Sequence, residues 1–250
     1  MGRAKEILVK VIPSKIANDF VKKHHYSGKV VPNSKLHFGC FLDEKLHGVL
    51  SYGPSINKKG TINLVSNTGW NEFIELNRMA FDEYLPKFSE SRCIAITIKL
   101  IKKNAPQIKW VISFADGTQC GDGTIYRASG FDLIKIKKNT SMWVNIHTNK
   151  KMQDMQFYHT MTKKDKNWKP LEGVMFTYIY LIDKKYKLTT PILPFSKIDE
   201  MGAGMYKGKK ITLQERRVTK SDAVDSNATS DLGNQCATIT PTSQNKNNKK

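Results

Sequence analysis

The stretch from Lys109 to Phe131 constrains the fold more than any other part of the sequence. It opens with an apolar run at residues 110–115 that contains β-branched side chains and stops abruptly at Asp116-Gly117. This pattern predicts a buried strand that ends in a turn. Glycines then permit a tight loop, and residues 124–129 fit a short helix. Because ligands of open α/β sheets bind at such strand ends, beside a helix N-terminus, we expect a binding site here.

The segments around this stretch alternate between strand and helix patterns. Period-2 and short apolar runs predict strands at 7–11, 36–42, 46–52, 73–79, 133–137 and 174–182. Helical periodicity predicts helices at 14–23, with Ser14 as the N-cap, and at 93–103. Residues 57–60 are expected to form a polar loop. This order predicts a mixed α/β (α+β) sheet flanked by helices, with 74–79 and 110–115 as neighbouring parallel strands.

The composition changes near Leu213. From there to the last residue the chain is rich in Ser, Thr, Asn, Gln and Lys and has almost no large apolar side chains. Such a segment cannot bury enough apolar surface to offset the entropy lost on folding. We therefore expect a single domain at 1–212 and a disordered polar tail at 213–250.

The charge balance points to a polyanionic partner. The chain has 41 Lys and Arg against 22 Asp and Glu, a net charge of +19. Such an excess favours nucleic acid, with a membrane surface as the second choice. No apolar run reaches the roughly 20 residues that span a bilayer, and the N-terminus lacks an apolar signal segment, so we expect a cytoplasmic protein. Four scattered cysteines without a CxxC pair predict neither a zinc knuckle nor disulfides, with Cys40 and Cys93 in the core.

Several polar residues stand where chemistry is feasible. Asp116 could act as a general base, bind a metal or cap the turn, and Tyr126 could act as an acid or pack as a core aromatic. His25 and Tyr26 follow a helix, where the imidazole could take part in catalysis or cap the helix end. His25 with Asp116 is a candidate metal pair, although two ligands are a weak signal. Arg78 lies within an apolar strand, so its guanidinium needs a partner.

The segment before the second helix is a candidate anion site. Ser89, Ser91 and Arg92 open that helix, where hydroxyls, backbone amides and the helix dipole suit a pyrophosphate, or where the serines are ordinary caps. The sequence contains no GxxxxGK[ST], GxSxG or HExxH motif. These absences argue against a P-loop nucleotide triphosphatase, an α/β-hydrolase and a zinc protease of that type.

An ordered series of motifs resembles the Mom family of phage and prophage DNA-modification proteins. The motifs are HHYSG (24–28), VPNS (31–34), FGCFL with GVLSYG (38–53), ELNRM (75–79), PKFSESR (86–92), KWVISFAD (109–116), GDGTIYRASGF (121–131) and WKPLEG with FTYIYLID (168–183). The resemblance implies a GNAT-like, acetyltransferase-type fold. It also implies an enzyme that installs a carbamoylmethyl (acetamido) group on adenine N6 in double-stranded DNA, which protects phage DNA from host restriction.

Carried over by position, the family's functional residues fall on His25, Tyr26, Arg78, Ser91, Asp116 and Tyr126. The resulting hypothesis assigns Asp116 as base or metal ligand with His25 as its partner, Tyr26 and Tyr126 as orienting or stacking groups, and Arg78 with Ser91 to the donor. Because adenine N6 lies inside the base stack, the enzyme must flip the base, and contacts of Lys and Arg with phosphates can offset that cost.

The donor and the cofactor stay open at this level. Acetyl-CoA or a related donor is one option, although PKFSESR departs from the glycine-rich pyrophosphate loop of acetyltransferases, and iron or another divalent metal is a second option. A homodimer is left open. Two other functions compete with the one above: an N-acetyltransferase that acts on an amine of nucleic acid or protein, and a basic DNA-binding protein without catalysis.

Overall fold

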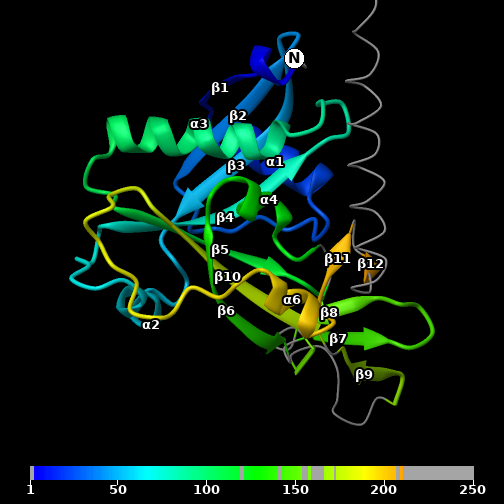
Figure 1. The fold of residues 1–250 in the computed structure, drawn as a ribbon. Coiled ribbons are helices and arrows are strands. Elements are labelled where there is room, and N and C mark those ends of the chain that lie inside the picture. Colours follow the sequence, from blue (N-terminus) through cyan, green and yellow to red (C-terminus); the bar gives the residue numbers. More distant parts are fainter. Residues whose placement is uncertain are drawn as a thin grey trace, which may run out of the picture. The chain divides into compact units, whose positions relative to one another are not determined.

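A seven-stranded sheet organises the molecule (Figure 1). The computed structural model describes residues 3–118, 121–139, 142–153, 157–158, 166–171, 173–206 and 209–210. The strand order is β1-β2-β3-β4-β5-β10-β6, and only the β4–β5 pair is parallel. The strands are β1 Leu8–Val11, β2 Leu36–Leu42, β3 Lys45–Gly53, β4 Phe73–Phe81, β5 Trp110–Asp116, β6 Asp132–Asn139 and β10 Gly173–Leu181. This confirms the predicted mixed α/β sheet and its parallel pair.

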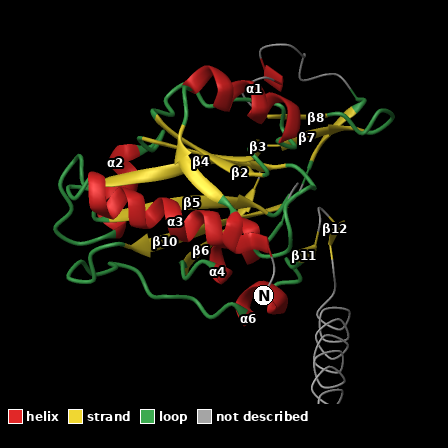
Figure 2. Ribbon diagram, turned by 90° about the horizontal axis from the view of Figure 1, so that it is seen from above, coloured by secondary structure: helices red, strands yellow, loops and turns green. Residues whose placement is uncertain are grey.

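Helices cover both faces of the sheet (Figure 2). α1 (Ser14–His24) packs Ala17 and Val21 against Val49 of β3, whereas α3 (Ser89–Asn104) and α4 (Thr124–Ala128) pack over the core that contains Leu50. Successive residues of a strand point to opposite faces, so Val49 and Leu50 mark the two faces. α1 therefore covers one face, called here the α1 face, and α3 and α4 cover the other, called the α4 face.

Two local predictions are wrong. The N-cap of α1 is Pro13, with extended backbone and no side-chain cap bond, and Ser14 is the first helical residue. Residues 57–60 are not a loop, because the Oδ1 of Asn57 accepts a hydrogen bond from the Gly60 amide (3.1 Å) and starts the short helix α2, Lys58–Thr61. An asparagine side chain can satisfy a first-turn amide in this way, so Asn57 is a helix signal here.

Smaller elements complete the described chain. They are η1 Arg3–Glu6, η2 Ile62–Leu64, a three-stranded sheet of β7 Met142–Asn145, β8 Lys151–Gln153 and β9 Trp168–Pro170, the helix α6 Ser196–Glu200, and the pair β11 Met205–Tyr206 and β12 Lys209–Lys210. The last of these, the pair of β11 and β12, is antiparallel. Cys40 and Cys93 are fully buried, as predicted.

The predicted tail and the question of a membrane span depend on which residues the structure describes. The expected tail at 213–250 falls outside the described part of the chain, so the domain boundary stays a prediction. In the described part, no helix combines the length and apolar character that crossing a bilayer requires.

A β-bulge in β4 changes which side chains face which helix. Ser51 of β3 is paired with Arg78 and Tyr52 with Leu76, so Asn77 has no partner across the ladder. Leu76 packs in the core of the α4 face, whereas Ala80 packs in the core of the α1 face. Strict alternation would put both on one face. The extra residue therefore places Asn77 and Arg78, although consecutive, both on the α1 face.

The parallel strands β4 and β5 separate along their length. Their pairing covers Phe73–Glu75 with Trp110–Ile112. Beyond it, β4 stays paired with β3 up to Phe81, and β5 stays paired with β10 up to Asp116. An opening in the sheet therefore lies between the carboxyl-terminal halves of the two strands.

Candidate functional site

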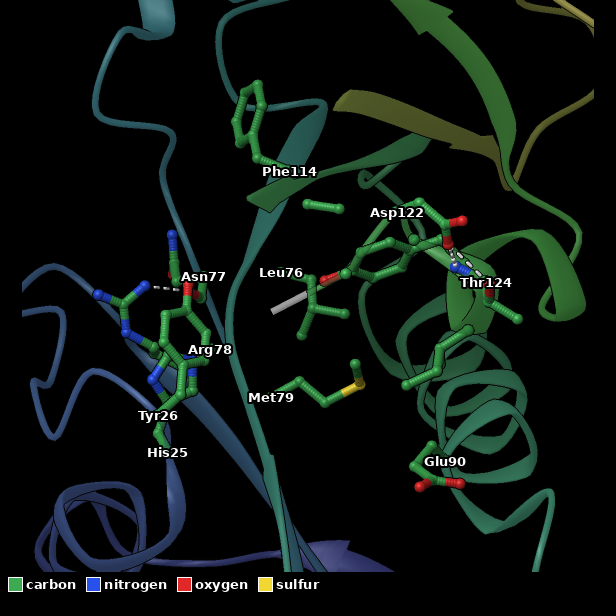
Figure 3. A pocket seen from close by; sticks show the side chains of 15 residues that line it. His25, Tyr26, Leu76, Asn77, Arg78, Met79, Glu90, Phe114, Asp122 and Thr124 are labelled. Carbon is green, nitrogen blue, oxygen red and sulfur yellow. Dashed lines mark hydrogen bonds between the residues drawn. The ribbon is translucent and has the colours of Figure 1, made fainter. Parts of the chain in front are cut away.

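A pocket of about 480 Å³ fills the opening between β4 and β5 (Figure 3). Its walls come from the end of α1, from β4, α3 and β5, and from the loop that leads into α4. The lining residues are His25, Tyr26, Leu76, Asn77, Arg78, Met79, Glu90, Phe114, Ala115, Gly121, Asp122, Gly123, Thr124, Ile125 and Tyr126. The strand-end site expected from the sequence is thus a cavity, at the carboxyl end of a parallel pair.

The pocket reaches both faces of the sheet. His25, Tyr26, Asn77 and Arg78 cluster on one side of β4, and Met79, Glu90 and Thr124 lie on the other (Figure 3). The first group belongs to the α1 face and the second to the α4 face. The pocket is therefore lined by side chains from both faces of the sheet.

The His25 imidazole has a lowered pKa and accepts a hydrogen bond at Nδ1. Burial, together with the charge of Arg78, lowers the pKa of its imidazole from 6.5 to about 4. Its Nδ1 accepts from the Ser27 amide (3.2 Å) and lies 2.8 Å from the Ser27 hydroxyl. In a neutral imidazole whose Nδ1 accepts, the proton sits on Nε2. His25 also ends α1 through its backbone, which is the capping role considered from the sequence, whereas its role in catalysis stays a prediction.

Two exposed aromatic rings flank the pocket. Tyr26 is 53% exposed, and its ring centroid lies 4.2 Å from that of His25. Phe114 of β5 is 39% exposed although it stands within an otherwise buried strand. Exposed aromatic faces are platforms on which nucleobases stack. Phe114 was missed in the sequence because it stands in an apolar run, where a phenylalanine indicates core.

Arg78 is half-buried and tied to backbone carbonyls. Its Nε donates to the Lys29 carbonyl (3.0 Å) and its Nη1 to the Asn77 carbonyl (2.9 Å). The first bond holds the segment that follows Tyr26 against β4. Within the described residues no carboxylate lies at salt-bridge distance from the guanidinium. Its charge is therefore available to the pocket.

Tyr126 is packed and also lines the pocket. It is 8% exposed, with ring centroids 5.5 Å from Phe131 and 5.4 Å from Tyr178. The two readings of the sequence, core aromatic and site residue, are therefore compatible. The α4 helix that carries Tyr126 begins after Gly123, which has a φ of +82°. A Cβ at this glycine would lie 2.3 Å from the Tyr178 ring, so the position has room only for glycine.

Asp122 holds the start of α4. Its Oδ1 accepts from the Thr124 amide (3.1 Å) and hydroxyl (2.8 Å) and forms a 3.2 Å salt bridge with Arg127. The Tyr178 hydroxyl donates to the Asp122 carbonyl. The Asp122 side chain is almost fully buried and was not singled out in the sequence. The spacing of aspartate and threonine at 122 and 124, typical of a side-chain turn, is the signal that could have found it.

Asp116 is not among the residues that line the pocket. Its Oδ1 accepts from the Thr118 amide (2.9 Å) and from Nδ2 of Asn139 on β6 (3.3 Å). The carboxylate thus fixes the turn after β5, which is one of the roles that the sequence allows.

The expected metal pair does not come together in this pocket. His25 lines it and Asp116 does not. Across the described residues, no group of three or more His, Cys, Asp and Glu side chains could hold a metal ion. The side chains therefore do not fit iron or another divalent metal.

The expected anion site has its hydroxyls occupied. The Ser89 Oγ donates to the Pro86 carbonyl (2.5 Å), the Ser91 Oγ to the Phe88 carbonyl (3.2 Å), and Arg92 to the Lys5 carbonyl (3.3 Å). Of this helix start only Glu90 lines the pocket. A pyrophosphate accepts hydrogen bonds and repels a carboxylate, so these side chains do not fit the pyrophosphate of coenzyme A.

Known proteins resemble this chain in sequence and, more weakly, in structure. The methylcarbamoylase Mom of Escherichia phage Mu is 36% identical over 160 residues, which are 64% of this chain and 62% of that protein. The match therefore spans less than two thirds of the relative's length. A Bacillus subtilis acetyltransferase in complex with CoA and a Staphylococcus aureus N-acetyltransferase each give a TM-score of 0.40, at 10% and 12% identity. They cover 70% of this chain and 98% and 97% of their own.

Structural similarity at that level says nothing about ligands or chemistry. The sequence model of the Mom protein family, in contrast, matches residues 6–197, which contain every residue of the pocket. Because that match covers most of the chain, the protein belongs to the Mom protein family.

Proposed function

We propose that this protein is a transferase that attaches a carbamoylmethyl (acetamido) group to N6 of adenine in double-stranded DNA, and so protects phage DNA from restriction. Its family and the name of its phage Mu relative support a reaction of this kind. The observation that carries the proposal is that one pocket is lined from both faces of the sheet, which offers an acceptor base and a group donor separate surfaces.

The α1 face suits a flipped base. A base enters between the exposed rings of Tyr26 and Phe114, and the Nε2–H of His25 and the Arg78 guanidinium supply hydrogen-bond donors. Flipping costs a few kcal/mol. Contacts of lysines with DNA phosphates can offset it, and exposed Lys22, Lys23, Lys29 and Lys35 flank this face in the sequence.

The α4 face suits the donor. Leu76, Met79 and Ile125 offer apolar contacts, and Tyr126 reaches the pocket from α4. In the transfer, the bond from N6 to the donor carbon forms, the bond from that carbon to its leaving group breaks, and N6 loses a proton. We assign the proton relay to Tyr126: its hydroxyl gives its proton to the leaving group, and its oxygen takes up the proton that N6 loses. Asp116 is assigned to holding the loop that carries Asp122 and α4.

The expected setting is the bacterial cytoplasm, where the DNA is. The pocket is built from one chain, so the homodimer considered from the sequence stays a prediction.

Nucleoside mass spectrometry of DNA from cells that express the protein tests the proposal. We expect a modified deoxyadenosine that carries the carbamoylmethyl mass, and its loss with Tyr126→Phe. An acetyl mass on DNA or protein would instead indicate an N-acetyltransferase. Unmodified DNA from cells with well-folded protein, combined with salt-dependent DNA binding, would indicate a binding protein and overturn the proposal.

A further inference from the structure

Asn77 is the unpaired residue of the β4 bulge and lines the pocket. Its side chain is buried, with 6% exposure, and it lies on the α1 face beside Arg78 (Figure 3). A bulge redirects a side chain and is common beside active sites. Without the extra residue, Asn77 and Arg78 could not both face the same side of the sheet.

One end of the Asn77 amide is fixed and the other is open. Oδ1 accepts a hydrogen bond from the Ser34 hydroxyl (3.1 Å). For Nδ2, no acceptor in the described part of the chain meets hydrogen-bond geometry. The Glu75 carboxyl lies close to the Asn77 amide. Burial raises the pKa of Glu75, and contacts with the Ser55 and Asn77 side chains oppose that rise. Since Nδ2 carries two hydrogens, at least one has no acceptor even when the other points to Glu75.

An unsatisfied donor in a buried pocket is costly and indicates a ligand. Leaving such a group without a partner costs roughly 1–3 kcal/mol. Ser34 bonds one end of the amide, and the neighbouring Glu75 carboxylate, which only accepts, favours Nδ2 at the other end, so Nδ2 is held ready for an acceptor. On the α1 face, which the proposed function gives to the base, that acceptor belongs to the base.

We propose that Asn77 is a specificity-determining residue whose Nδ2 donates to a ring nitrogen of the flipped adenine. The inference rests on the proposed function. Adenine in DNA offers N1, N3 and N7 as acceptors, while N6 must stay free to react. Asparagine recognises a base through such polar contacts, and a site built for one rejects an analogue that lacks the acceptor.

Analogue binding tests the contact without any donor molecule. The probes are duplexes in which the target adenine, opposite an abasic site, is kept or replaced by 1-deaza-, 3-deaza- or 7-deazaadenine, and affinity is measured by fluorescence anisotropy. One analogue should bind the wild type about 3- to 10-fold more weakly than adenine. In Asn77→Asp, which keeps an oxygen for Ser34 but loses the donor, that preference should vanish while the ratios for the other two analogues persist.

A neighbouring asparagine provides the matched control. The Nδ2 of Asn33 donates to the Pro54 carbonyl (2.6 Å), and Asn33 does not line the pocket. Asn33→Asp should lower thermal stability and leave all analogue ratios as in the wild type. If Asn77→Asp does not fold, Asn77→Ala gives the same test, because alanine also lacks the donor.

Two results would overturn the inference: a wild type that binds all three analogues as tightly as adenine, or a folded Asn77 variant that keeps the wild-type preference. Nucleoside mass spectrometry on wild-type cells separates this from failure of the proposed function. Modified DNA without an analogue effect rejects the role of Asn77 alone, whereas unmodified DNA rejects the proposed reaction.

Discussion

The two sides of the pocket differ in chemistry although one strand builds both. On the α1 face β4 contributes Asn77 and Arg78, next to His25, and this side is polar and rich in hydrogen-bond donors. On the α4 face the same strand contributes the apolar Leu76 and Met79 beside Tyr126, and the polar groups there are Glu90, Asp122 and Thr124 from other elements. The difference shows how a sheet can keep two reactants apart until they meet: it offers each of them a surface of a different kind.

The largest effect is expected from Arg78→Lys, which removes guanidinium contacts on the α1 face. A lysine lacks the planar fork with which Arg78 donates from two separate nitrogens to the Lys29 and Asn77 carbonyls, so the loop after Tyr26 loses this tether. DNA modification, measured by nucleoside mass spectrometry, should fall by about 10³-fold, because small errors of position are costly in catalysis. Arg92→Lys, at a residue outside the pocket lining, is the control and should stay within about 3-fold of wild type. Equal losses in both variants would contradict the assignment.

Tyr126→Phe tests the α4 face. The ring and its packing on Phe131 and Tyr178 are kept, and only the hydroxyl is lost. We expect a drop of about 10²-fold in modification, the lower end for a general acid, with little change in Tm. Tyr180→Phe, at a tyrosine that packs on Phe131 outside the pocket, serves as the control. Full activity of Tyr126→Phe would remove the hydroxyl from the mechanism.

Substitutions of Asp116 test whether this residue acts through the loop. Asn can still accept from the Thr118 amide, whereas Ala cannot. If Asp116 positions the loop, Asp116→Ala should lower modification about 10-fold and Asp116→Asn clearly less. An Asn variant as inactive as the Ala variant would show that the negative charge takes part in the reaction.

The smallest effect concerns the dependence of stability on pH through His25. Its pKa is about 4 in the folded protein and near 6.5 when exposed, so between these values the unfolded state binds more protons. Stability should therefore fall as pH drops from 6.5 to 4. In His25→Gln the loss of unfolding free energy between pH 7 and pH 4.5 should be smaller by about 1 kcal/mol, after allowance for solvent screening. Urea unfolding at pH 7 and pH 4.5 measures it, and identical slopes for both proteins would contradict the lowered pKa.

The sequence was sufficient for features that depend on local pattern. The strands β2 and β3, the parallel pair of β4 and β5, and α4 after a glycine loop all follow from periodicity and turn residues. His25, Tyr26, Arg78 and Tyr126 were picked out by residue type and by family resemblance, and the structure gathers them in one pocket.

Features that depend on pairing between strands were not predictable. Asn77 looks like an ordinary polar residue in ELNRM, since the bulge exists only in the register between β4 and β3. Asp116 and Asp122 both precede glycine, and only the path of the loop decides which one lines the pocket. The hydroxyls at 89 and 91 suggest an anion site until their carbonyl partners are known.

The bulge also makes the site sensitive to the number of residues in β4, and not only to their identity. Removing Asn77 would restore regular alternation while Leu76 and Arg78 keep their faces, so this deletion would cost the Asn77 side chain and the bulge alone. Removing another residue of β4 while the bulge stays would turn the residues on one side of the deletion to the opposite face. A deletion scan through 74–80 should therefore show a milder loss of function at 77 than at its neighbours.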